Sequence, residues 1–267
     1  VLFRSTPTNR NVSNSNNSYI YTYLYNLNTM KKAIVVGATS GIGRKLAEIL
    51  ADNGYMVGIT GRRGELLNEI STQKPHVFRT MVMDVNDTTT SISKLKALVD
   101  ELGGLDLLVL SSGIGERNNR LDYEIEQAIV QTNVVGYTCI IDWAFNLFAA
   151  KKSGHLVGIS SIAGLRGGQV GPAYGATKAY QINYLEALRL RSARKKLGVT
   201  VTDIRPGFVD TAIIGGGKVF WMASTDKAGL QIYRAIKKKC KVAYITRRWI
   251  LVAWLLKLVP RFIYDRA

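Results

Sequence analysis

Cysteine and histidine are scarce in this sequence. Its 267 residues include two cysteines, Cys139 and Cys240, and two histidines, His76 and His155. The cysteines lack the close spacing of a zinc site and are too few for a disulfide scaffold, which fits a reducing compartment. The histidines are too isolated for a metal centre, and we interpret them as structural or exposed residues. The sequence therefore predicts no metal, and we expect a cytoplasmic protein.

Acidic residues are also few. The chain has 19 Asp and Glu residues against 36 Lys and Arg residues, which gives a formal net charge of +17 at pH 7. Such an excess attracts phosphate-bearing partners of any kind, including nucleotides, nucleic acid and anionic lipid. Because no recognition-helix or zinc-finger pattern accompanies it, we expect no nucleic-acid partner.

The chain also lacks an apolar run long enough to cross a bilayer. Its most apolar segment, residues 249–259, is shorter than the about 20 residues that a spanning helix needs. Residues 1–29 contain no acidic side chain and are rich in Asn, Ser and Thr, so we expect a disordered N-terminal tail. This tail has neither the apolar centre nor the cleavage pattern of a signal peptide. We interpret Met30 as the original initiator.

From Ala33 onward, short apolar runs alternate with longer segments of helical periodicity. The runs are AIVV, YMVGIT, VFRTMVMDV, LDLLVL, HLVGIS, VTVTDI and KVAYI. Continuous apolar runs are typical of parallel strands that are buried on both faces. The pattern predicts one α/β domain over residues 30–248, a Rossmann-type, doubly wound parallel sheet of about seven strands with helices on both faces.

A glycine-rich turn follows the first of these runs. The stretch GATSGIGRKLAEIL places Gly37, Gly41 and Gly43 between a predicted strand and a predicted amphipathic helix. Glycines at such a junction allow a tight turn and close approach of the backbone, and the helix supplies unpaired N–H groups at its amino end. We therefore expect the phosphates of a nucleotide cofactor to bind here.

A second motif is the stretch PAYGATKAY, residues 172–180. On a helix, Tyr174 and Lys178 lie on one face, one turn apart, so that the ammonium group lies beside the phenol. That arrangement suits proton transfer, although a surface Tyr/Lys pair has the same spacing.

Together these motifs resemble the short-chain dehydrogenase/reductase family over residues 31 to about 246. The glycine turn has the family spacing Gly-x-x-x-Gly-x-Gly, the pair Tyr174 and Lys178 matches Tyr-x-x-x-Lys, and Ser161 stands thirteen residues before the tyrosine. Two positions depart from the family pattern. Val36 precedes the first glycine where the family usually has Thr, and Ser111-Ser112-Gly113 occupies the last three places of Asn-Asn-Ala-Gly.

The resemblance implies four catalytic residues. Tyr174 would exchange a proton with the substrate oxygen, and Ser161, with Ser160 beside it, would hold that oxygen. Lys178 would bind the nicotinamide ribose, and its charge is expected to lower the pKa of Tyr174. Asn133, in the stretch QTNVVG, would hold a water that links the lysine to solvent.

The cofactor preference follows from the end of the second strand. Arg62 and Arg63 occur there without an acidic residue, and an arginine pairs with a ribose 2'-phosphate where an acid would bind the 2'-OH. We therefore expect NADP(H) rather than NAD(H). The residues expected to bind it are Gly37, Thr39, Ser40, Gly41, Ile42, Gly43, Arg62, Arg63, Asp84, Val85, Ser111, Ser112, Gly113, Tyr174, Lys178, Pro206, Gly207, Val209 and Thr211.

The substrate side offers no obvious partner for a charged group. Residues 215–217 are glycines that could hinge a lid, and Phe220, Trp221 and Met222 could form an apolar wall. These features favour an apolar ketone or alcohol as the substrate.

The carboxyl-terminal segment, residues 249–267, is apolar and basic. With the cations that surround it between residues 237 and 266, it could lie on an anionic membrane surface. Packing on the domain's own core or against another subunit is an equal alternative, since family members commonly form dimers or tetramers.

The resulting hypothesis is an NADP(H)-dependent oxidoreductase that interconverts an apolar carbonyl compound and its alcohol. The alternative is a non-catalytic NADP(H)-binding regulatory or interaction protein of the same fold.

Overall fold

The computed structural model describes residues 30–169, 171–211 and 220–266. Residues Lys31–Ala267 form one compact unit. The expected N-terminal tail, residues 1–29, and the predicted hinge glycines, residues 215–217, lie outside the described residues.

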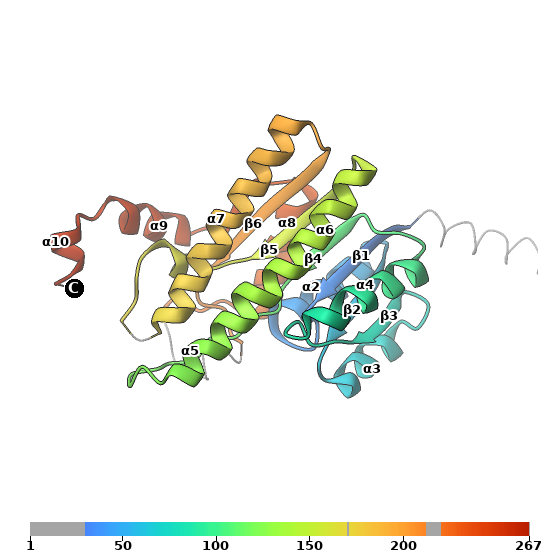
Figure 1. Cartoon of the computed structure of the whole chain (residues 1–267), viewed down its shortest axis with the longest axis horizontal. Coiled ribbons are helices and arrows are strands. Elements are labelled where there is room, and N and C mark those ends of the chain that lie inside the picture. The colour runs from blue at the N-terminus through green and yellow to red at the C-terminus, as the bar shows by residue number, and fades with distance from the viewer. Residues whose placement is uncertain (1–29, 170, 212–219, 267) are drawn as a thin grey trace, which may run out of the picture. The chain divides into compact units, whose positions relative to one another are not determined.

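The described residues form one sheet of seven parallel strands (Figure 1), which confirms the predicted architecture. The strand order is β3-β2-β1-β4-β5-β6-β7. The strands are β1 (Lys31–Val36), β2 (Tyr55–Gly61), β3 (Phe78–Val82), β4 (Leu107–Leu110), β5 (Gly154–Ile159), β6 (Val199–Pro206) and β7 (Val242–Ile245). The order reverses between β1 and β4, and in open parallel sheets ligands bind at such a reversal, beyond the carboxyl ends of the strands.

Helices cover both faces of the sheet because the strands are apolar on both sides. One face packs in a single core cluster with α2 (Gly41–Asp52), α3 (Gly64–Gln73) and α8 (Thr225–Lys237). The other face is covered by α4 (Thr88–Leu102), α6 (Tyr137–Lys151) and α7 (Pro172–Lys195), which lie in front of the sheet in Figure 1. Neighbouring residues of one strand pack against the helices on opposite faces of the sheet. Val35 lies in the cluster beneath α2, whereas the Ile34 side chain faces Leu98 of α4 across Gly58.

Several short elements lie at the carboxyl edge of the sheet. They are α5 (Tyr123–Val130), a π-helical turn η1 (Gln131–Gly136), a 3-10 turn η2 (Ile162–Leu165), α9 (Trp249–Leu258) and α10 (Arg261–Tyr264). No helix formed by the described residues is both long and apolar enough to cross a membrane.

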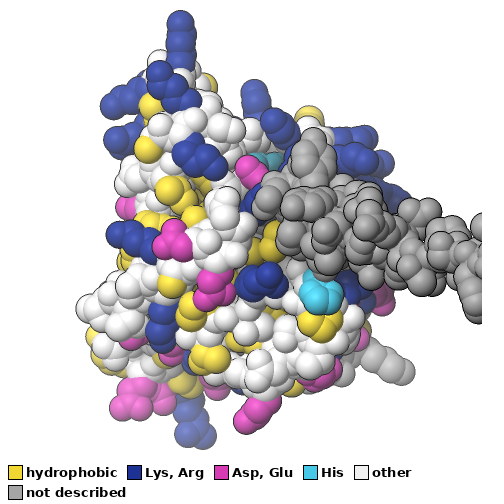
Figure 2. All heavy atoms as spheres, turned by 90° about the vertical axis from the view of Figure 1, so that its right-hand side faces the viewer, with side chains coloured by type: hydrophobic (Ala, Val, Ile, Leu, Met, Phe, Trp, Pro, Cys, Tyr) yellow, Lys and Arg dark blue, Asp and Glu magenta, His cyan; other side chains and the backbone are white. Residues whose placement is uncertain are grey.

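The opposite, amino edge of the sheet carries much of the positive charge. The last turns of α6 and α7 lie at the top of Figure 1 and end in exposed lysines and an arginine, namely Lys151, Lys152, Arg194, Lys195 and Lys196. Figure 2 shows Lys and Arg side chains concentrated at the top of the molecule and acidic side chains mostly below them. This charge therefore lies far from the carboxyl edge.

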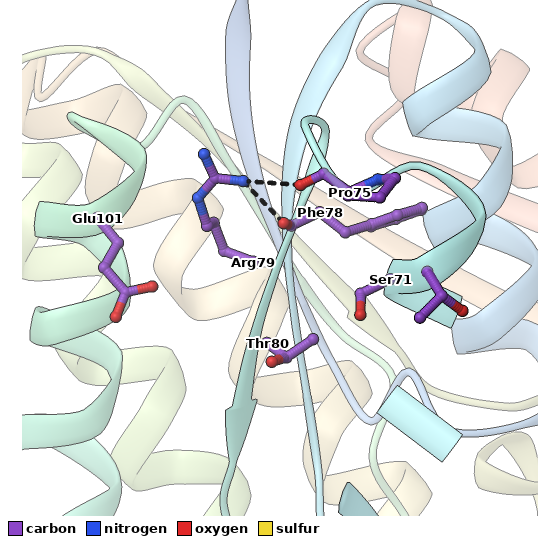
Figure 3. Close-up of a pocket in the computed structure, with 7 residues that line it drawn as sticks. Ser71, Pro75, Phe78, Arg79, Thr80 and Glu101 are labelled. Carbon is purple, nitrogen blue, oxygen red and sulfur yellow. Dashed lines mark hydrogen bonds between the residues drawn. The ribbon is translucent and has the colours of Figure 1, made fainter. Parts of the chain in front are cut away.

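A pocket of about 330 Å³ lies beside the outer strand β3, between α3 and the end of α4 (Figure 3). The guanidinium group of Arg79 is directed at backbone oxygens there, with Nη1 donating to the Pro75 oxygen at 3.3 Å and the Phe78 oxygen at 2.9 Å. Phe78 begins β3, so this pocket is at the amino end of the strand and is separate from the predicted site.

Candidate active site

The glycine turn joins β1 to α2 in a conformation that requires glycine. Gly37 has φ +86° and Gly41 has φ +58°, both in the left-handed region that disfavours side chains. A Cβ atom on Gly43 would lie 2.0 Å from the Gly37 oxygen, so α2 starts directly against the turn. The free N–H groups at the amino end of α2 and the small residues of the turn form a cradle suited to phosphate.

The two arginines that follow β2 differ in their contacts. Arg63 Nη2 donates to Thr39 Oγ1 at 2.7 Å and to Ser40 Oγ at 2.9 Å, which holds its guanidinium over the glycine turn. Arg62 is exposed. Thr39 and Ser40, two residues of the glycine turn that we expected to bind cofactor, therefore hold the Arg63 side chain beside the phosphate cradle.

The loop after β4 lies between the glycine turn and the predicted catalytic residues. The amides of Ser111 and Ser112 both donate to the Val36 oxygen, at 2.9 and 3.0 Å. A Cβ atom on Gly113 would lie 3.2 Å from Asn133 Oδ1 and 3.5 Å from Lys178 Nζ. The backbone at Gly113 thus passes close to both Asn133 and Lys178.

Asp84 and Val85 follow β3 at the same edge. Asp84 Oδ1 accepts a hydrogen bond from the Asn86 amide at 3.0 Å, which turns the chain. Val85 is buried, and its backbone oxygen would lie 2.4 Å from a Cβ atom on Gly136. The segment after β3 therefore packs closely against the π-helical turn that contains Asn133.

Tyr174 and Lys178 lie on the first turns of α7, which Pro172 begins. Lys178 Nζ is 5.7 Å from the centroid of the Tyr174 ring. A Cβ atom on Gly115 would come within 2.6 Å of the same ring. Ser161 begins the 3-10 turn η2, and its Oγ accepts from the Ala163 amide at 3.1 Å. The structure brings these three predicted residues together.

The ionisation of Tyr174 differs from the sequence expectation. Burial raises the pKa of Tyr174, and its hydrogen bond with Ser161 opposes this only in part. The expectation of a lowered pKa for Tyr174 was therefore wrong, because desolvation of the phenolate is the dominant influence. The tyrosine is held as a neutral phenol, ready to donate a proton.

Lys178 is buried among neutral acceptors. Its Nζ donates to the Ile159 oxygen at 3.1 Å and to Gln181 Oε1 at 2.9 Å. Burial lowers the pKa of Lys178 to about 8, against an opposing influence from Asp203. The lysine therefore changes its charge close to neutral pH.

Gln181 is a site residue that the sequence analysis missed. It is fully buried, and its Nε2 donates to the Asn133 oxygen at 2.8 Å while its Oε1 accepts from Lys178. One side chain thus joins the backbone of Asn133 to the lysine, where the resemblance implied a water. Its spacing of three residues after Lys178 was a signal, but a glutamine on a helix is equally common on the surface.

The side chain of Asn133 is used within the protein. Its Oδ1 accepts from the Ile114 amide at 2.9 Å, and its Nδ2 donates to the Ile114 oxygen at 2.7 Å and to Thr177 Oγ1 at 3.1 Å. Asn133 lies in the π-helical turn, a distortion that occurs frequently at functional sites. It fixes the loop after β4 against α7.

Ser160 does not share the role of Ser161. Its Oγ donates to the carboxylate of Asp203 and to the Ile204 oxygen, within the buried layer. Asp203 also accepts from Arg205 Nε at 2.6 Å. The expectation that Ser160 helps to hold the substrate oxygen was wrong, because its hydroxyl is committed to this buried acid.

The segment after β6 connects the glycine turn to the carboxyl-terminal helix. Thr211 Cγ2 would lie 3.1 Å from a Cβ atom on Gly41, so Thr211 reaches the phosphate cradle. Val209 is buried and bridges Ala223. The amide of Gly207 donates to the Ile245 oxygen at 2.6 Å, which ties the end of β6 to β7.

An aromatic cluster covers this segment. The Trp249 ring lies edge-on to Phe208 and Trp221, with centroids 5.4 and 5.8 Å apart, and Phe220 stacks on Trp221 at 4.5 Å. Pro206 ends β6 beneath the cluster. The predicted apolar wall is thus continuous with the start of α9.

Comparisons with known proteins agree with this geometry. A family model described as short chain dehydrogenase matches residues 31–217. An uncharacterized oxidoreductase of Myxococcus xanthus (strain DK1622) is 33% identical over 247 residues, covering 89% of this chain and 96% of that protein. An uncharacterized oxidoreductase of Staphylococcus epidermidis is 32% identical over 188 residues, covering 70% of this chain and 81% of that protein. Among solved structures, ElxO with NADP bound superposes with a TM-score of 0.73 at 23% identity, over 81% of this chain and 97% of that one.

Proposed function

The chain belongs to the short chain dehydrogenase family, and from this premise we propose that it is an NADP(H)-dependent oxidoreductase that interconverts an apolar carbonyl compound and its alcohol. The observation that carries the proposal is the grouping of Ser161, Tyr174 and Lys178 against the backbone of two glycines, Gly113 and Gly115, where any side chain would crowd the lysine and the tyrosine. The loop after β4, the turn η2 and helix α7 bring these five residues together at the edge where parallel sheets bind ligands.

The residues at the carboxyl edge fit a nicotinamide dinucleotide. The turn from Gly37 to Gly43 would hold the pyrophosphate, and Thr211 lies against it. Arg63, braced by Thr39 and Ser40, would pair with a ribose 2'-phosphate. The NADP in the structure of ElxO, a protein of the same fold, is in line with this choice. When bound, the nicotinamide supplies or accepts the hydride.

The side chains of this protein supply the proton and hold the oxygen. Tyr174, whose raised pKa keeps it protonated, donates to the substrate oxygen during carbonyl reduction and accepts a proton in the reverse direction. Ser161 donates a hydrogen bond to the same oxygen and stabilises the negative charge that develops there. The Lys178 ammonium adds a positive charge close to the phenol and restores its proton.

The test is an NADPH-oxidation assay with a panel of apolar ketones and aldehydes. Tyr174→Phe should lower kcat by about a hundred- to ten-thousandfold, the contribution of general acid catalysis, while the Kd for NADPH changes little. Tyr180→Phe is the matched control. It removes a hydroxyl from the same helix, one bonded to Thr138 at 2.7 Å outside the site, and should retain activity. Full activity in Tyr174→Phe would refute the proposal.

A further inference from the structure

Helix α9 is apolar on both its buried and its exposed face. Trp249 and Ala253 are buried against the domain. On the opposite face, four apolar side chains are largely exposed, Leu251 at 71%, Trp254 at 66%, Leu255 at 62% and Leu258 at 72%. Phe262 and Ile263 of α10 continue the exposed surface. We call these six residues the outer face; a contiguous apolar surface of this kind marks an interaction site.

Exposed cations accompany the outer face. Residues 246–266 contain five Lys or Arg residues (Arg247, Arg248, Lys257, Arg261 and Arg266), all exposed, against Asp265 as the one acid. The lysines at 237–241 do not belong to this surface, since they precede β7 and α9 follows its carboxyl end. The cationic surface is therefore narrower than the sequence range 237–266.

The charges decide which occupant suits this face. In a symmetric dimer the same surface meets itself, so five cations would face five cations with a single acid on each side. An anionic bilayer instead attracts each of them, and tryptophan and the leucines are the residues that enter its interface. Helix α9 has 10 residues, which is too short to span and suited to lie flat.

Helices α9 and α10 are also fastened to the substrate side of the site. Arg166, directly after the turn that Ser161 begins, donates from Nε to the Leu256 oxygen at 2.7 Å and from Nη2 to the Val259 oxygen. The Tyr264 hydroxyl donates to the Gly167 oxygen at 2.7 Å. In Figure 1, α9 and α10 project from the sheet at the edge where η2 and the loop after it lie. The outer face is thus held at the side of the molecule where substrate would enter.

We propose that α9 and α10 dock the enzyme on the surface of an anionic bilayer, so that it takes its carbonyl substrate from the membrane. The choice of substrate class rests on the proposed function, whereas docking itself does not. The outer face enters the headgroup region and the cations at 247, 248, 257, 261 and 266 contact lipid phosphates. The aromatic cluster around Trp249 connects α9 to the segment after β6.

Docking is tested by cosedimentation of the full chain with vesicles of phosphatidylcholine alone or with a third of phosphatidylserine. The wild type should bind the anionic vesicles, and the double variant Leu251→Asn, Leu255→Asn should bind them at least about tenfold more weakly, a factor that corresponds to about 1.4 kcal/mol. The matched control is Leu190→Asn with Leu230→Asn, two half-exposed leucines of α7 and α8, which should bind as the wild type does. Lys257→Gln with Arg261→Gln should weaken binding to anionic vesicles only, as should added salt.

Three results would overturn the proposal. The first is wild-type protein that stays in the supernatant with anionic vesicles, and the second is vesicle binding that the leucine variant leaves unchanged. The third is a dimer, seen by light scattering without lipid, that the leucine variant dissociates, because a second copy would then cover the outer face.

The substrate class has its own readout. With a long-chain ketone dissolved in anionic vesicles, the leucine variant should oxidise NADPH at least about tenfold more slowly than the wild type, as its lost binding dictates, while both reduce a short water-soluble ketone equally. Tyr174→Phe should bind vesicles normally. Vesicle binding without any ketone reduction would leave docking standing and remove the proposed function, so the two failures are distinguishable.

Discussion

Gln181 offers the most direct test of how this site controls its charge. Its Oε1 accepts from the Lys178 ammonium at 2.9 Å in a fully buried position. Gln181→Met keeps the shape of the side chain and removes this acceptor. Gln181→Glu keeps an acceptor and adds a negative charge. Both variants lose the donor to the Asn133 oxygen, so a difference between them reports on the contact with the lysine alone.

The expected effect follows from the energy of a hydrogen bond to a charged group, about 1.5–3 kcal/mol. One pKa unit corresponds to about 1.36 kcal/mol, so Gln181→Met should lower the pKa of Lys178 by about one to two units from its value of about 8. Gln181→Glu should raise that pKa, because an adjacent carboxylate favours the ammonium.

The assay is the pH dependence of kcat/KM for NADPH-dependent ketone reduction. We expect activity to fall as the pH rises through the pKa of Lys178, since the protonated lysine supports catalysis. The wild-type midpoint should lie near pH 8, with that of Gln181→Met lower and that of Gln181→Glu higher. Gln127→Met, at an exposed glutamine of α5, should match the wild type. Coincident profiles for wild type, Gln181→Met and Gln181→Glu would refute the reasoning.

The free energy of unfolding should also depend on the pKa of Lys178, but it should rise with pH where activity falls. The pKa of Lys178 is about 8 in the folded protein against an ordinary value of 10.5, so between these values the unfolded chain binds more protons. Unfolding free energy should therefore rise with pH across that window, by up to about 3 kcal/mol from this residue. Urea unfolding at pH 7 and pH 10 measures it, with Lys178→Met as the variant in which the rise disappears.

Four further variants test single contacts. Arg63→Ala should raise the KM for NADPH by about ten- to a hundredfold, the loss of one charged hydrogen-bonding partner, with little change for NADH, and Arg62→Ala should have a smaller effect in the same steady-state assay. Gly207→Ala should destabilise the fold by about 1–3 kcal/mol in urea unfolding, because its Cβ atom would lie 2.2 Å from the Trp249 ring. Arg166→Met should speed hydrogen exchange of the α9 amides, because it removes the donors to two oxygens at the end of that helix.

The fold could be predicted because its signal is local. Each strand is a continuous apolar run, and residues such as Ile34 and Val35 are buried on opposite faces with no exposure at all. The glycine turn could also be predicted from the sequence, since Gly37 and Gly41 adopt backbone angles that other residues avoid. A short sequence window contains all of this information.

The charge relations of the site are not local. Gln181 lies 48 residues from Asn133, and Asp203 lies 43 residues from Ser160. The residue types in these two pairs do not by themselves predict that a hydrogen bond forms. Ser160 and Ser161 are adjacent in the sequence, yet Ser160 donates to the buried Asp203 and Ser161 is hydrogen-bonded to Tyr174. The direction of the Tyr174 pKa shift also required the structure, because burial raises this pKa, the hydrogen bond with Ser161 lowers it, and only their relative size decides the outcome.

The buried charges together favour negative charge on the substrate. Among the buried side chains that the structure describes, two are cations, Lys178 and Arg205, and one is an anion, Asp203. His155 is neutral at physiological pH, since burial lowers its pKa to about 4. Asp203 is bound by Arg205 at 2.6 Å, and the hydrogen-bond acceptors that Lys178 contacts directly are neutral, although Asp203 still raises the pKa of the lysine against its burial. In a site of low polarity, a buried cation with neutral acceptors would stabilise an oxygen that becomes negative, and the pairing of Asp203 with Arg205 favours that role for Lys178.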